Sequence, residues 1–113
     1  MFKFLSKLFA GVPSIDIETY LDEYEGKNNH VLIDVRTPNE FKSGHVAKAK
    51  NIPLNTISKK MKNIPKDKPV VLICRTGNRS GMAARQLAGA GYENIINLKG
   101  GMMRWQAQGH PLK

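Results

Sequence analysis

The chain has 113 residues, of which 41% are hydrophobic, so it is long enough for one compact domain and too short for two. Its 18 Lys and Arg residues against nine Asp and Glu give a net charge of +9, which favours anionic partners. A single cysteine excludes an intramolecular disulfide and a thiolate zinc cluster, and it indicates a reducing, cytoplasmic location. No apolar run reaches the roughly 20 residues that a membrane-spanning helix needs.

The first twelve residues carry apolar side chains at helical spacing. The pattern consists of Phe2, Leu5, Phe9 and Val12, with Lys3 and Lys7 between them. A secretory signal needs a longer uninterrupted apolar centre, so we do not expect export. The spacing predicts a short amphipathic helix over 1–12, and three roles stay open for it: packing on the domain, contacting a partner, or resting weakly on a membrane surface. The domain itself is expected over 13–113.

The domain is predicted to begin with a helix and a strand. Asp16 is a typical N-cap residue, and Gly26 ends the helix. The apolar stripe between them is Ile17, Tyr20, Leu21 and Tyr24. The β-branched run 31–35 then predicts a buried strand.

The middle of the chain predicts short elements in a basic stretch. A helical turn over 39–42 stops at Gly44, residues 51–53 end a short strand, and a small helix is expected over 56–61. The lysines are Lys42, Lys48, Lys50, Lys59, Lys60, Lys62, Lys66 and Lys68. This stretch has no aromatic residue for stacking and no C2H2, RNP-type or helix-turn-helix pattern, so we interpret it as a solvated surface and expect no specific nucleic-acid binding.

The last third alternates apolar strands and helices. Strands are predicted over 70–74 and 95–98, with a helix over 79–90 between them. A final helix follows Gly100-Gly101 and contains Trp105. Apolar strands separated by helices predict an α/β fold with a parallel sheet covered on both faces.

Cys74 ends one of these strands, at the edge where open α/β sheets place their ligands. The residues that lead from it into the next helix are Arg75, Thr76, Gly77, Asn78, Arg79 and Ser80. Because a tight turn and a helix start direct several backbone N–H groups to one point, this loop is suited to an anion above the cysteine sulfur.

The same surroundings predict a reactive thiolate. The helix end, the guanidinium groups of Arg75 and Arg79, and the N–H donors all favour the ionised sulfur and lower the pKa of Cys74. Ser80 either caps the helix or donates its hydroxyl to the sulfur. Most lone cysteines are buried structural residues, but a structural cysteine does not require two arginines, a glycine and a helix start within six residues. We therefore interpret Cys74 as a nucleophile.

Several blocks of the chain together resemble a single-domain rhodanese, in order from about Val12 to Lys113. They are Asp34-Val35-Arg36-Thr37-Pro38-Asn39-Glu40-Phe41, Gly44-His45-Val46, Ala49, Asn51-Ile52-Pro53, the loop from Cys74 to Ser80, and Gly100-Gly101 with Trp105. The resemblance implies a five-stranded parallel sheet flanked by helices, and sulfur transfer. In that reaction the cysteine takes a sulfane sulfur from a donor such as thiosulfate and carries it as a persulfide. It then passes the sulfur to cyanide or to a thiol.

The implied partners are a small anionic sulfur donor and an external thiol or protein acceptor, because the chain has no second cysteine. Two other functions stay open. A cysteine phosphatase or arsenate reductase also places a thiolate in an anion loop, but those families have one more residue between cysteine and arginine than the four between Cys74 and Arg79. A noncatalytic rhodanese-like binding module is the other, although such modules usually lack the cysteine.

The remaining polar residues are expected to be structural. Asp34 needs a partner in its buried strand, which Arg36 or a backbone N–H can supply, and Arg36 is also placed to pair with Glu40. His45 is expected to bond to backbone. His30 and His110 are expected in solvent, and Met102 and Met103 on the packed face of the last helix, unless residues after Gly100-Gly101 edge the pocket. The histidines and the cysteine show no metal-ligand spacing, so we expect neither a metal nor a cofactor.

Overall fold

The computed structural model describes residues 12–113, which form a five-stranded parallel sheet with strand order β1-β5-β4-β2-β3. The strands are β1 (Ser14–Ile15), β2 (Val31–Asp34), β3 (Lys50–Asn51), β4 (Val70–Ile73) and β5 (Ile95–Leu98). The expected α/β fold with five parallel strands is confirmed. Apart from Val12, the helix predicted over 1–12 lies outside the described residues.

The centre of the sheet is β4, which is buried along its whole length. Successive side chains of a strand point to opposite faces, so Val70 and Leu72 pack in one core cluster and Val71 and Ile73 in the other. Each of these four residues is fully buried and stabilises the fold by about 1.5–3 kcal/mol. The continuous apolar run in the sequence is thus a consequence of two covered faces.

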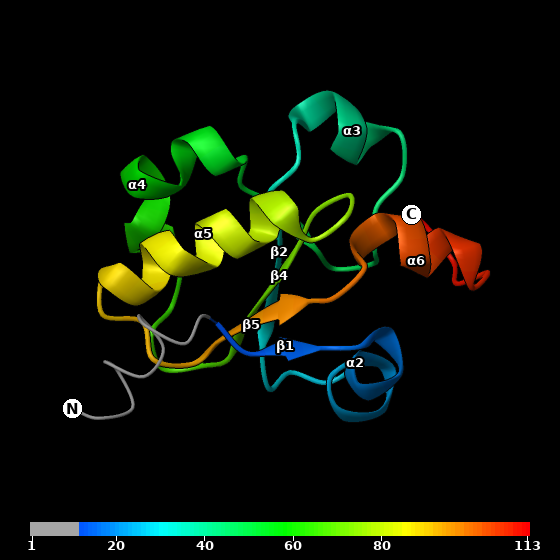
Figure 1. The fold of residues 1–113 in the computed structure, drawn as a ribbon, viewed down its shortest axis with the longest axis horizontal. Coiled ribbons are helices and arrows are strands. Elements are labelled where there is room, and N and C mark those ends of the chain that lie inside the picture. Colours follow the sequence, from blue (N-terminus) through cyan, green and yellow to red (C-terminus); the bar gives the residue numbers. More distant parts are fainter. Residues whose placement is uncertain (1–11) are drawn as a thin grey trace.

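Five helices surround the sheet in the described part of the chain. They are α2 (Ile17–Glu23), α3 (Pro38–Lys42), α4 (Ile57–Lys60), α5 (Asn78–Gly89) and α6 (Gly101–Ala107), with 3-10 turns η1 (Leu54–Thr56) and η2 (Met61–Asn63) flanking α4. In Figure 1, α4 and α5 lie above the sheet and α2 lies below it. Residues of α4 and α5 pack in one core cluster, and residues of α2 and α6 pack in the other.

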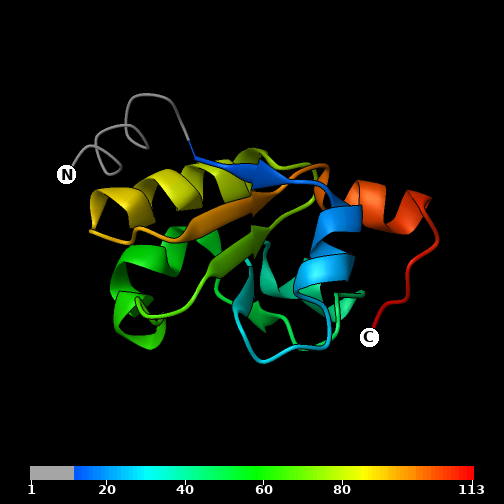
Figure 2. The same ribbon diagram turned by 90° about the horizontal axis from the view of Figure 1, so that it is seen from below.

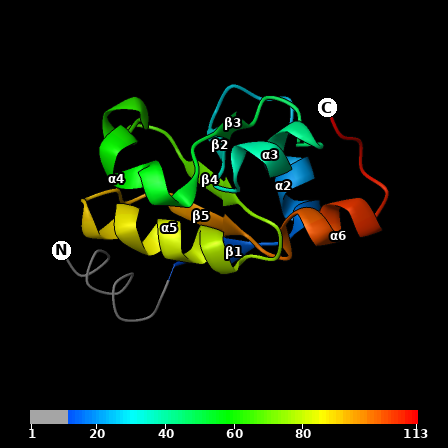
Figure 3. The same ribbon diagram turned by 90° about the horizontal axis from the view of Figure 1, so that it is seen from above.

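The carboxyl ends of the strands point toward α6 (Figure 2). Seen from above, α3 and α6 lie at the same end of the molecule, away from α4 (Figure 3). The chain following β2 and the chain following β4 therefore meet at one edge of the sheet, as expected for parallel strands.

The helix caps follow from the residue types at the helix starts. Asp16 accepts a hydrogen bond of 2.8 Å from the Thr19 N–H and begins α2, as predicted. α3 buries no side chain and depends on its ends: Pro38 begins it, and Thr37 and Glu40 form a capping box. α3 is thus a short element fixed by polar contacts beside the sheet edge.

β2 ends at Asp34, one residue before its predicted end, and β3 ends at Asn51. Two further differences concern the edge of the sheet and the cysteine. β1 is a strand that no residue pattern predicted, because two residues are too few to show a period. β4 ends at Ile73, one residue before the predicted end, so Cys74 is the first residue after the strand. Between residues 12 and 113, no helix has the length and apolar character to cross a membrane.

Candidate active site

The residues expected to form the site, Cys74 to Ser80, lie in one turn at the carboxyl end of the central strand. Cys74 follows β4, and α5 begins at Asn78 after Gly77. Gly77 has φ +112°, a left-handed conformation that residues with a side chain rarely adopt. This turn reverses the backbone within three residues, so that the start of α5 is brought over the cysteine sulfur.

Two donors point at the sulfur. The Gly77 N–H donates to Cys74 Sγ at 3.0 Å, and the Ser80 hydroxyl lies 3.3 Å from the same atom. Burial of Cys74 raises its pKa, but the hydrogen bonds from Ser80, Gly77 and Thr76 lower it by more, so the pKa of the thiol lies below its usual value. Cys74 is therefore a buried cysteine, 1% exposed, whose surrounding donors favour the thiolate.

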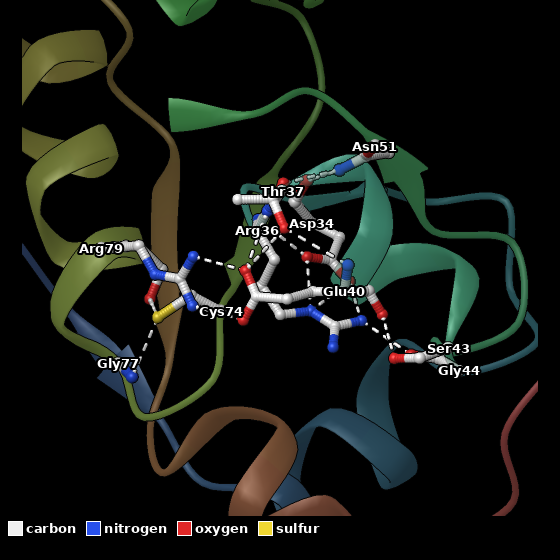
Figure 4. Close-up of polar contacts among 11 residues, drawn as sticks. Asp34, Arg36, Thr37, Glu40, Ser43, Gly44, Asn51, Cys74, Gly77 and Arg79 are labelled. Carbon is white, nitrogen blue, oxygen red and sulfur yellow. Dashed lines mark hydrogen bonds and ion pairs between the residues drawn. The ribbon is translucent and has the colours of Figure 1, made fainter. Parts of the chain in front are cut away.

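The arginines of the loop are placed differently from expectation. Arg75 is exposed, whereas the Arg79 guanidinium donates hydrogen bonds of 2.7 and 2.8 Å to the two carboxylate oxygens of Glu40. Figure 4 shows the Arg79 side chain between Cys74 and Glu40. The groups that lower the pKa of Cys74 are thus foremost the Ser80 hydroxyl and the loop N–H groups.

Arg36 pairs with Asp34, which confirms one of the expected pairings. Its Nη2 lies 2.7 Å from Asp34 Oδ2, its backbone N–H donates to Oδ1, and Nη2 also donates to the Gly44 carbonyl at 2.8 Å. The alternative pairing of Arg36 with Glu40 is wrong, because Asp34 and Gly44 already engage the Arg36 fork and Glu40 binds Arg79. The Arg36 contacts fix the chain that carries α3 against the end of β2.

Asn97, the polar residue of β5, also lies at this site, which the sequence pattern does not predict. Asn97 Oδ1 accepts from the Ser80 hydroxyl at 2.5 Å, and Asn97 Nδ2 donates to the Gly77 carbonyl at 3.3 Å. A hydroxyl has one proton, so Asn97 and the Cys74 sulfur compete for the Ser80 donor. The signal for Asn97 was present in the sequence as the one polar residue in the apolar run 95–98.

The start of α6 holds the other side of the loop. The N–H groups of Met102 and Met103 donate to the carbonyls of Cys74 and Arg75 at 2.8 and 2.9 Å. Gly101, at φ +56°, lies so close that a Cβ would overlap both of these carbonyls. Residues after Gly100 thus do edge the loop, and they do so through their backbone.

The remaining predicted residues fall outside this cluster. His45 Nδ1 donates to the Phe41 carbonyl at 2.8 Å, as expected of a backbone contact. The expectation of a solvent position is wrong for His30, which is half-buried and bonds the Tyr20 hydroxyl at 2.9 Å, and His110 is half-buried against Trp105. The rings of Tyr20 and Trp105 pack against these two histidines and cover part of their surface.

The methionines of α6 separate into two environments. Met102 is buried as predicted, but Met103 is 53% exposed, because it lies on the outer face of the helix. Among the residues that the structure describes, no group of three or more His, Cys, Asp and Glu could hold a metal ion.

Comparisons with known proteins agree with this geometry. A family model described as Rhodanese-like domain matches residues 17–108. A sulfurtransferase of Allochromatium vinosum is 37% identical over 101 residues, covering 89% of this chain and 94% of the relative. The uncharacterized protein YqhL of Bacillus subtilis is 50% identical over 74 residues, which cover 66% of this chain and 59% of YqhL.

The fold agrees as well. The crystal structure of a rhodanese-related protein from Thermoplasma volcanium superimposes with a TM-score of 0.81 at 32% identity, covering 89% of this chain and 97% of that one. With the family model spanning most of the chain and a cysteine in the loop that follows the central strand, the chain belongs to the rhodanese-like family.

Proposed function

We propose that the chain is a sulfurtransferase that takes a sulfane sulfur from a donor such as thiosulfate, carries it as a persulfide on Cys74, and passes it to a thiol or cyanide. The observation that carries the proposal is the pair of donors on the sulfur, the Gly77 N–H at 3.0 Å and the Ser80 hydroxyl at 3.3 Å. A lowered thiol pKa makes a larger fraction of Cys74 thiolate at neutral pH, and the thiolate is the nucleophile.

The first half-reaction loads the enzyme. The Cys74 thiolate attacks the outer sulfur of thiosulfate, a new S–S bond forms, and the bond from that sulfur to the sulfonate breaks. Sulfite leaves with the bonding electron pair. The product, Cys–S–S⁻, is an anion one atom longer than the thiolate, and loop N–H groups stabilise such an anion as an oxyanion hole does. In comparable sites, removing one donor costs about 2.7–4 kcal/mol.

The second half-reaction removes the outer sulfur from the Cys74 persulfide. A thiolate or cyanide attacks the outer sulfur, the bond to Cys74 Sγ breaks, and Cys74 leaves as the stabilised thiolate. Because the chain has a single cysteine, no internal thiol resolves the persulfide, and turnover is ping-pong. The sulfurtransferase of Allochromatium vinosum, most of whose length this chain covers, supports this reaction class.

The arginines are proposed to act on the departing anion. Exposed Arg75 is available to it, and Arg79 reaches it when its bond to Glu40 opens. Thr76 and Asn78 are proposed to contribute backbone N–H groups, and Gly77 the turn that aims them.

Intact mass spectrometry after thiosulfate treatment tests the proposal. We expect a gain of one sulfur atom that cyanide removes, and no gain in Cys74→Ser. Circular dichroism of the variant checks that the fold is kept. Cys74→Ser that retains its transfer rate, or wild-type protein that hydrolyses phosphoesters and gains no sulfur, would show the proposal to be wrong.

A further inference from the structure

A groove of about 460 Å³ lies beside the active-site loop. It is lined by Thr76 of the loop and by residues at and along α6, namely Gly100, Met103, Arg104, Ala107 and Gln108. The groove thus reaches from the outer face of α6 to the residue two positions after Cys74. No step of the proposed reaction on a small donor uses the α6 part of it.

The groove has a fixed distance from the nucleophile. The Met102 and Met103 N–H groups bond the Cys74 and Arg75 carbonyls, and Gly101 is packed tightly on the same two carbonyls. Because α6 and the loop are joined at their backbones, a segment bound along α6 is held in a set position relative to the sulfur. Positioning of this kind is what a transfer between two large molecules requires.

The surface of the groove combines apolar and basic groups. Met103 is 53% exposed, and its unbranched thioether chain adapts to varied partners. Arg104 lies in the groove, and exposed Arg75 and Lys99 adjoin Thr76 and Gly100. None of these three cations forms an ion pair within 4.0 Å with another described residue.

Asp16 is an acidic residue that lies near two of these cations. The pKa of Asp16, the N-cap of α2, is lowered foremost by its hydrogen bonds with Thr19 and to a smaller extent by the positive charges of Lys99 and Arg104, so this carboxylate offsets part of their charge. Glu40 is engaged by Arg79. The groove therefore keeps an excess of positive charge, which is complementary to an acidic segment.

From these observations we propose that the groove between the loop and α6 docks an acidic, cysteine-bearing segment of a partner protein, which accepts the sulfur. This rests on the proposed function. In the step, the partner thiolate attacks the outer sulfur of the Cys74 persulfide, the new S–S bond forms on the partner, and the bond to Cys74 Sγ breaks. The Cys74 thiolate leaves with the electron pair, so the transfer needs no oxidant.

The first measurement separates docking from sulfur chemistry. A synthetic peptide of acidic residues with one leucine, and serine in place of cysteine, is titrated into the unloaded protein by calorimetry, next to a lysine-containing peptide of the same length. We expect binding of the acidic peptide that weakens with salt, and none of the basic peptide. Equal binding of both, or of neither, would overturn the docking proposal even if the protein loads sulfur normally.

The second measurement follows transfer from the loaded protein to the same acidic peptide carrying cysteine. Its rate is divided by the rate with 2-mercaptoethanol, a small neutral thiol. Arg104→Glu is expected to lower this ratio about tenfold, and Met103→Ala several-fold. Matched controls lie on α5 outside the groove: Met82, which is 48% exposed, changed to Ala, and exposed Arg85 changed to Glu.

The outcomes are distinguishable. If α5 variants lower the ratio as much as α6 variants, only the global charge matters and the docking site is wrong. If ultracentrifugation shows a self-associated species that Met103→Ala disperses, a second copy occupies the groove and the proposal is overturned. If the protein gains no sulfur at all, the proposed function fails, whereas calorimetry with Arg104→Glu beside the α5 control Arg85→Glu still decides whether the acidic peptide binds at the groove.

Discussion

Arg79 of α5 and Glu40 of α3 form a bidentate ion pair, although the two residues lie 39 positions apart in the chain. Glu40 also accepts from the Thr37 N–H at 3.0 Å, so one carboxylate caps α3 and holds the first turn of α5. In the proposed reaction, an anionic sulfur donor therefore competes with Glu40 for the Arg79 guanidinium.

Glu40→Gln is expected to free Arg79. Glutamine keeps the capping box but removes the charge, so the KM for thiosulfate should fall several-fold in steady-state sulfur transfer to cyanide. Glu93→Gln, at an exposed residue between α5 and β5, is the control and should leave KM unchanged. A KM that stays the same or rises in Glu40→Gln would show that Arg79 does not bind the donor.

The Arg79–Glu40 ion pair also predicts that the stability of the fold depends on pH in the acidic range. Arg79 foremost, with Thr37, lowers the pKa of Glu40 to about 2, against burial that raises it. The stabilisation is therefore fully present above the unfolded-state pKa of about 4.5 and is lost as pH falls toward 2. Both side chains are about one third exposed, so solvent screens the pair and we expect about 1 kcal/mol or less.

Urea unfolding at a series of pH values measures this contribution. The difference in unfolding free energy between wild type and Glu40→Gln should shrink between about pH 4.5 and pH 2 and be constant above it. Because wild type and variant share all other acidic groups, the contributions of those groups cancel in this difference. A constant difference across this range would mean that the pair does not stabilise the fold.

Ser80→Ala is expected to raise the pKa of Cys74. The variant loses the hydroxyl donor that most lowers this pKa, while burial continues to raise it. The rate of alkylation by iodoacetamide should therefore increase at a higher pH than in wild type, and sulfur loading at neutral pH should slow several-fold. Ser58→Ala, at an exposed position of α4, serves as the control. An unshifted alkylation profile would place the source of thiolate stabilisation elsewhere.

Gly101→Ala is expected to destabilise the fold and disturb the loop. Its left-handed conformation costs an alanine about 1–2 kcal/mol, and overlap with the Cys74 and Arg75 carbonyls adds roughly 1–3 kcal/mol. Gly109→Ala is a matched control, with φ +76° and nothing within 4 Å, so it should show the conformational cost alone. Equal losses of unfolding free energy in the two variants would contradict the close packing of α6 on the loop.

The sequence predicted the parts of this molecule that repeat a local pattern. The apolar runs over 70–74 and 95–98 became β4 and β5, and the stripe after Asp16 became α2, because side-chain spacing and caps act within a few residues. The position of the Cys74 loop followed from the same logic, since a parallel sheet brings each strand's carboxyl end to one edge.

The pairings across the chain were harder to predict. Sequence proximity offers Arg36 as one possible partner for Glu40, whereas the fold brings Arg79 of α5 within reach of it. Asn97 was counted as part of a strand, and only the register of β5 beside β4 places it against Ser80. Long-range polar contacts depend on tertiary placement that no local period encodes.

The two outermost strands of the sheet in the described part of the chain, β1 and β3, have only two residues each. Ile52 and Leu54 donate inward to the Asp34 and Val35 carbonyls, so Pro53 lies on the outward side, where it has no N–H to offer. The short edge strands and the proline offer few free backbone groups with which a strand of a neighbouring chain can pair. A domain with a fully apolar central strand is in this way protected against growing into aggregates.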